Sequence, residues 1–118
     1  MIKVKATREG LLGKQMASGL PVSDRVPFVA LPSVGALYRF VRLTNPLNNL
    51  STLAIVLDVG PWNIKDEDYV FKGMRPQAES GVDHSGRMTN HAGIDLGEKV
   101  WKTLKMEGNT EVEWEFIS

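Results

Sequence analysis

The stretch best equipped for chemistry is Leu57-Asp58-Val59-Gly60-Pro61-Trp62, at the end of the apolar residues 53–56. A strand here brings one carboxyl group, that of Asp58, to a Gly-Pro turn that a tryptophan follows. Apolar neighbours disfavour the ionised form of a carboxyl group, so Asp58 is suited to carry a proton for acid–base catalysis. Alternatively, Asp58 accepts hydrogen bonds from turn amides. The indole of Trp62 can stack on a sugar ring or pack in the core.

A second carboxyl group, that of Asp95, precedes a helical pattern and could act together with Asp58. Glu98 follows three residues later, and this spacing is also that of a helix N-terminus in which Asp95 is the capping residue. The capping interpretation is favoured over the catalytic one.

Three further candidates for substrate binding lie in residues 63–93. Tyr69 is expected to contact either a ligand or the barrel. Arg75 can hold a carboxylate through its forked guanidinium, or it can face solvent. Glu79 is a third acidic candidate. His84 and His91 match no metal-ligand spacing, so hydrogen-bonded or solvated histidines are expected, with no metal and no cofactor.

Composition narrows the class of protein. The length of 118 residues predicts one domain over residues 1–118. Fourteen basic and fourteen acidic residues cancel, which argues against nucleic-acid binding driven by charge. The absence of cysteine excludes disulfides, thiolate catalysis and cysteine-type zinc sites, and fits a bacterial or phage protein. No apolar run is long enough for a membrane span, and the alternating N-terminus predicts a strand instead of a signal peptide.

Hydrophobic periodicity predicts a mainly β protein. Strands are expected at residues 2–7, 37–44, 52–58 and 111–116, with Trp114 facing inward. One helix is expected at about 95–106, with Trp101 on its buried face. Residues 63–93 form a long loop insertion, and a segment of this length is typical of a lid or binding loop.

Five short motifs occur in an order that resembles the double-psi β-barrel family, which includes rare lipoprotein A, the expansins, barwin and related endoglucanases. The motifs are Gly13–Gly19, Ala30–Pro32, Arg39–Asn45, Asp58–Trp62 and Ile94–Gly97. They are similar to the family's early Gly-x-x-Thr-Ala-Ser/Asn-Gly loop, Leu-Pro turn, V-x-V-T-N strand, Asp-Arg-Gly-Pro-Phe box and Ile-Asp-Leu-Ser box.

The resemblance implies a six-stranded double-psi barrel whose groove holds a β-1,4-linked glycan. In the enzymes similar to rare lipoprotein A, this glycan is peptidoglycan of the bacterial envelope, cut by lytic transglycosylation. Asp58 occupies the position of the catalytic acid/base, and Asp95 that of a carboxyl group used by related endoglucanases. Ser18, in the first motif, is expected to contact substrate.

The chain departs from the family pattern at several positions. Phe28 stands where the family has a catalytic histidine, Met16 replaces a threonine, and Val59 replaces an arginine. The link between the last two motifs, residues 63–93, is short in the family. These departures favour two alternatives: a polysaccharide-binding barrel without catalysis, or an assembly barrel that makes protein contacts, for example in a phage particle.

Overall fold

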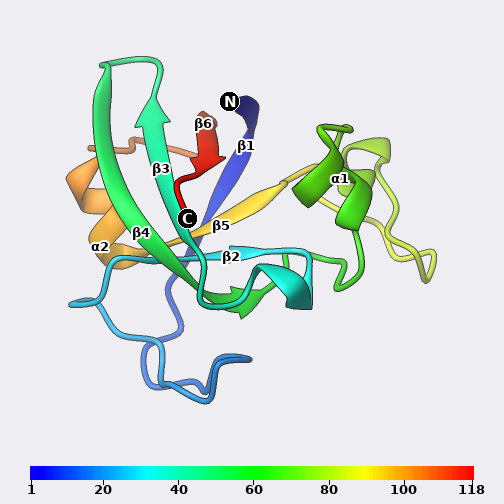
Figure 1. Ribbon diagram of the computed structural model, residues 1–118, viewed down its shortest axis with the longest axis horizontal. Helices are drawn as coiled ribbons and strands as arrows, with labels where there is room; N and C mark the ends of the chain where they lie inside the picture. Colours follow the sequence, from blue (N-terminus) through cyan, green and yellow to red (C-terminus); the bar gives the residue numbers. More distant parts are fainter.

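A computed structural model describes residues 1–118, and six strands in it form a closed barrel (Figure 1). The strands are β1 (Ile2–Glu9), β2 (Phe28–Leu31), β3 (Phe40–Asn45), β4 (Leu50–Val59), β5 (Ile94–Gly97) and β6 (Glu111–Phe116). Their order around the barrel is β1-β5-β2-β4-β3-β6. The pairs β1/β5 and β2/β4 are parallel and the other four are antiparallel. The expected mainly β architecture with a six-stranded barrel is confirmed.

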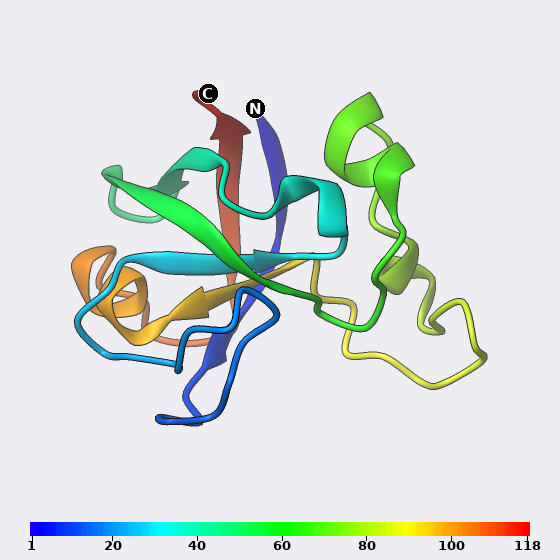
Figure 2. The ribbon, with the colours of Figure 1, turned by 60° about the horizontal axis from the view of Figure 1, so that its bottom comes forward.

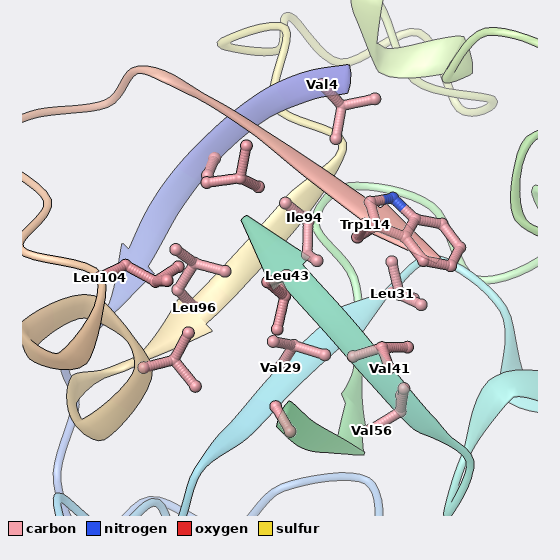
Figure 3. Packing of buried hydrophobic residues seen from close by; sticks show 14 of the residues in the cluster. Val4, Val29, Leu31, Val41, Leu43, Val56, Ile94, Leu96, Leu104 and Trp114 are labelled. Carbon is pink, nitrogen blue, oxygen red and sulfur yellow. The ribbon is translucent and has the colours of Figure 1, made fainter. Parts of the chain in front are cut away.

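Side chains along each strand alternate between the inside and the outside of the barrel, and the inward ones fill its interior (Figure 3). Val4 and Ala6 of β1 are fully buried, as are Val29 and Leu31 of β2. Trp114 of β6 is 2% exposed. Because successive side chains of a strand point to opposite faces, the residues between these positions lie on the outer wall.

The helix expected at about 95–106 is shorter than the sequence pattern suggested. Helix α2 spans Glu98–Thr103 and has Gly97 at its N-cap, without a side-chain capping bond. Asp95 instead lies in β5, where it pairs with β1 on one side and β2 on the other. The capping interpretation of Asp95 is therefore wrong, because pairing with two strands outweighs a local capping signal. Trp101, 8% exposed, does lie in the core as predicted.

The insertion at residues 63–93 contains more regular structure than expected. Helix α1 (Glu67–Lys72) is followed by a short 3₁₀ helix, Gln77–Ser80, and both lie to one side of the barrel (Figure 2). The protein thus has two short α-helices instead of one. Neither has the length and apolar character needed to cross a membrane.

Candidate functional site

Four outward residues form a row across the strands β4, β2, β5 and β1. Ala30 of β2 pairs with Asp58 of β4 and with Asp95 of β5, and Asp95 pairs with Thr7 of β1. Paired residues of neighbouring strands face the same side of a sheet. With strands about 4.8 Å apart, the Cα atoms of the two aspartates are separated by roughly 10 Å. The fold therefore brings the two predicted carboxyl groups together, with only the methyl group of Ala30 between them.

Asp58 is half-buried and is fixed on one side by the main chain. Its Oδ1 accepts the N–H groups of Ala17 and Val59, each at 2.9 Å. An oxygen that accepts two N–H bonds is not available to carry a proton. Oδ2 accepts no main-chain hydrogen bond, so half of the carboxyl group remains available for chemistry.

Residues 10–26, here called the 10–26 segment, supply one of these amides because the segment folds back against β2 and β4 (Figure 2). Met16 and Val22 of the segment pack on Phe28 and Leu57, and all four side chains are buried. Ser18 lies close to Asp58, because its N–H bonds the carbonyl of Leu57 at 3.1 Å. Ser18 is thus placed near the carboxyl row.

Asp95 is the more perturbed of the two aspartates. Burial raises its pKa to about 6, and the charge of Asp58 adds to the rise. A hydrogen bond from the hydroxyl of Thr7 opposes the rise by stabilising the carboxylate. Asp95 is therefore protonated in a substantial fraction at mildly acidic pH.

A third carboxyl group, that of Glu9, belongs to the site and was missed by the sequence reasoning. Glu9 ends β1 two residues after Thr7, on the same face of the strand. Its pKa is raised to about 8 by burial, then by the hydrogen bond and charge of Asp58 and the charge of Asp95. The available signal was the outward series Lys3, Lys5, Thr7, which Glu9 continues.

Trp62 lies beyond Asp58, at the start of the insertion. Its indole N–H donates to the side chain of Asn90 at 2.8 Å, and the guanidinium of Arg87 lies 5.9 Å from the ring centre. Trp62 is half-buried and belongs to neither hydrophobic cluster of the protein. Of the two alternatives for Trp62, packing in the core is thus wrong, and stacking on a sugar ring stays a prediction.

The other predicted substrate contacts lie away from the carboxyl row. Tyr69 is 1% exposed, and its hydroxyl donates to the carbonyl of Gly93 and accepts from the indole of Trp114, so it contacts the barrel, which is one of its two predicted roles. Arg75 and Glu79 form an ion pair at 2.5 Å. Arg75 also bonds the carbonyl of Lys3, which lies roughly 20 Å along β1 from Glu9 at about 3.4 Å per residue. Arg75 and Glu79 thus bind each other and do not contact the carboxyl row.

The two histidines are hydrogen-bonded, as one interpretation of the sequence predicted. His84 contacts the side chain of Asn63 at 2.9 Å, and His91 contacts the carbonyl of Glu79 at 3.1 Å. No three acidic or histidine side chains come together in a geometry that could hold a metal ion.

The carboxyl row is only partly accessible to solvent, because Ala30 is 1% exposed and Asp58, Asp95 and Glu9 are half-buried. None of the five main surface cavities is lined by Asp58, Asp95 or Glu9. One cavity of about 340 Å³ is lined by Arg8 and Gly10, the chain neighbours of Glu9, and by Glu98 and Lys102 of α2.

The fold and the site define a six-stranded β-barrel protein with a cluster of three carboxyl groups on its outer wall. The chain belongs to the family described as "Domain of unknown function (DUF8814)", which matches residues 1–115. None of the curated proteins matches the sequence. Among solved structures, the Streptomyces papain inhibitor (SPI) is similar over 99% of this chain and 94% of that chain, with a TM-score of 0.57 and 15% identity. At this identity the likeness shows the fold alone.

Proposed function

We propose that this protein binds and cleaves a β-1,4-linked glycan of the bacterial cell wall, peptidoglycan or a close relative, at the row formed by Asp58 and Asp95. The observation that carries the proposal is the register of β4, β2 and β5, which aligns two carboxyl groups distant in sequence. These are the residues that the resemblance to double-psi barrels singles out. The two parallel strand pairs are in keeping with that resemblance.

The two aspartates suit different roles in glycoside cleavage. The reaction needs an acid that protonates the bridging oxygen, and a base that takes a proton from water or from a sugar hydroxyl. Asp95, with a pKa raised by burial to about 6, carries a proton under mildly acidic conditions and suits the acid. Asp58, with two amides on Oδ1, suits the base. In this assignment Asp58 is not the proton donor that the sequence suggested.

The surroundings of the row suit an extended chain of sugars. Asp58 and Asp95 lie on either side of Ala30, and the 10–26 segment lies beside Asp58, to which its Ala17 amide is hydrogen-bonded. Trp62 lies beyond the same end of β4, where its ring can stack on a sugar. The absence of a deep cavity fits a polymer that lies along a surface better than a small molecule that is enclosed.

Binding without cleavage is the second candidate, and a specific observation favours it. Met16 and Phe28 stand where the resemblance implies a threonine and a histidine, and they are 4% and 0% exposed. Both pack in the small cluster that holds the 10–26 segment on the barrel. They pack against other apolar side chains at positions where the double-psi β-barrel family has polar groups.

Digestion of purified sacculi, followed by analysis of the released muropeptides, tests the proposal. We expect products with the native protein and with the control Asp68→Asn, whose side chain is 70% exposed in α1. Products should disappear in Asp58→Asn and in Asp95→Asn, while both variants still sediment with sacculi.

Each outcome of this assay separates the candidates. Anhydro-muropeptides would indicate lytic transglycosylation, and reducing ends would indicate hydrolysis. Sedimentation with sacculi without any product would support the binding module. Neither binding nor products, with peptidoglycan or with cellulose, would refute both candidates.

A further inference from the structure

The carboxyl group of Glu9 contains a buried oxygen that no hydrogen-bond donor reaches. Oε2 is inaccessible to solvent and has no donor among its neighbours. The charged groups that face Glu9 are Asp58 from β4, Asp95 from β5 and Lys14 from the 10–26 segment. Two of the three are acceptors when ionised, so Glu9 would add a third negative charge to a partly buried site.

A proton on Glu9 removes the third negative charge and gives the carboxyl group a hydrogen to donate. A buried carboxylate oxygen without a donor loses the hydrogen bonds that it made to water, whereas a protonated carboxyl group donates to a neighbouring acceptor. Asp58 is the neighbour with an acceptor to offer, because its Oδ1 is taken by the amides of Ala17 and Val59 while Oδ2 has no main-chain donor. The unpartnered oxygen of Glu9 and the free oxygen of Asp58 thus complement each other.

We propose that Glu9 is a positioning residue, which carries a proton at neutral pH, donates it in a hydrogen bond to Asp58, and so holds Asp58 as the ionised base of the site. When Glu9 ionises, the hydrogen bond is lost and two carboxylates repel each other, so the site fails at alkaline pH. The role of Asp58 as base rests on the proposed function, whereas the proton on Glu9 does not.

The electrostatics of the site agree with this geometry. The pKa of Glu9 is raised to about 8 by burial, then by the hydrogen bond and charge of Asp58, and then by the charge of Asp95; Lys14 opposes the rise. Glu9 is therefore mostly neutral at pH 7. Asp95, with a pKa of about 6, loses most of its own proton below the pH at which Glu9 titrates.

Carboxyl-carbon NMR titration of the full chain tests the proton on Glu9 without any glycan. In the native protein we expect the Glu9 side-chain carbon to titrate near pH 8. In Asp58→Asn the midpoint should fall, because the charged acceptor is gone. Glu111→Gln, an exposed substitution at the start of β6, should leave the midpoint unchanged. A Glu9 midpoint near its ordinary value of 4.5 in the folded protein would overturn the inference.

The pH profile of glycan cleavage tests the action of Glu9 through Asp58. Loss of the proton of Asp95 should lower kcat by about tenfold per pH unit above pH 6 in every variant, and ionisation of Glu9 should steepen the native fall to about a hundredfold per pH unit above the Glu9 midpoint. Glu9→Gln should lower kcat several-fold at neutral pH and abolish the second, steeper part of the fall, since an amide still donates but does not ionise. Glu111→Gln should keep the native profile. KM should change little in either variant.

The two assays keep the inference separate from the proposed function. A steepening of the fall above about pH 8 that persists in Glu9→Gln would refute the positioning role while the cleavage proposal stands. If the native protein cleaves no glycan, the proposed function fails, and the NMR titration still decides whether Glu9 holds the proton.

Discussion

Replacing Gly97 with alanine is expected to destabilise the barrel by placing a methyl group in the ring of Phe28. An added Cβ at position 97 would lie 2.5 Å from Cε1, 2.7 Å from Cδ1 and 2.9 Å from Cζ of that ring. The ring is fully buried beneath Met16 and Leu57, so it has little room to move. The backbone of Gly97, at φ −65° and ψ 164°, is open to alanine, so the cost is steric alone.

The expected size follows from overpacking of a closed core. Forcing an extra methyl group into a well-packed site costs about 1–3 kcal/mol. For a domain of this length, each kcal/mol corresponds to a fall in Tm of roughly 3–6 °C. Gly97→Ala should therefore lower Tm by roughly 5–15 °C.

Urea denaturation followed by circular dichroism measures this change, with Gly10→Ala as the matched control. An added Cβ at Gly10 meets nothing within 4 Å, so the control should stay within about 0.5 kcal/mol of the native protein. In a Phe28→Val background, which removes Cδ1, Cε1 and Cζ, Gly97→Ala should cost almost nothing. An equal cost in both backgrounds, or no cost in the native one, would refute the steric explanation.

Two further predictions concern buried polar groups. As the pH rises from 5 to 8, the free energy of unfolding of the native protein should fall relative to that of Glu9→Gln. Glu9 keeps its proton up to about pH 8 in the folded protein, whereas the unfolded chain releases it near pH 4.5. The full pKa difference corresponds to nearly 5 kcal/mol, which solvent screening of this partly exposed group reduces to about 2 kcal/mol. Urea unfolding midpoints of the two proteins at pH 5, 7 and 9 measure this difference in stability. A native protein that becomes more stable than Glu9→Gln as the pH rises would contradict the prediction. Tyr69→Phe should cost about 1–3 kcal/mol, since the Gly93 carbonyl and the Trp114 indole lose their buried partner. Tyr38→Phe, at an exposed tyrosine, should cost clearly less in the same denaturation assay, and similar losses would argue against burial as the cause.

Strand periodicity was the reliable part of the sequence. β1 and β6 alternate strictly, so the inward positions of Val4 and Trp114 could be predicted from their neighbours alone. Asp95 could not be placed in this way, because its spacing to Glu98 matches a helix start. The pairing of β5 with β1 and β2, which decides the matter, depends on residues distant in sequence.

The insertion shows a second limit of local reasoning. Tyr69 lies in a segment with little apolar periodicity, and its hydroxyl makes burial costly unless partners are present. Those partners, the Gly93 carbonyl and the Trp114 indole, come from elsewhere in the chain. Glu9 was missed for a related reason, because its chemical importance arises from Asp58 and Asp95 and not from its own neighbours.

Two differences from the double-psi β-barrel motifs that the sequence resembles are related by one contact. Phe28 stands where those motifs have a histidine, and Gly97 where they have a serine. Because the Phe28 ring occupies the space of a side chain at position 97, the larger residue at one position requires the smallest at the other. The Phe28 ring thus fits against Gly97 and packs on the 10–26 segment, whose Ala17 amide binds Asp58.

The three neighbouring carboxyl groups, those of Asp58, Asp95 and Glu9, lie in different local environments. Asp58 receives two main-chain amides, Asp95 receives the hydroxyl of Thr7, and the buried oxygen of Glu9 receives no donor. Three like charges at this distance would repel strongly in a partly buried site, so the group without a donor is the one that keeps its proton. Separate environments for neighbouring carboxyl groups produce an acid and a base at one pH, which is the property that glycoside cleavage requires.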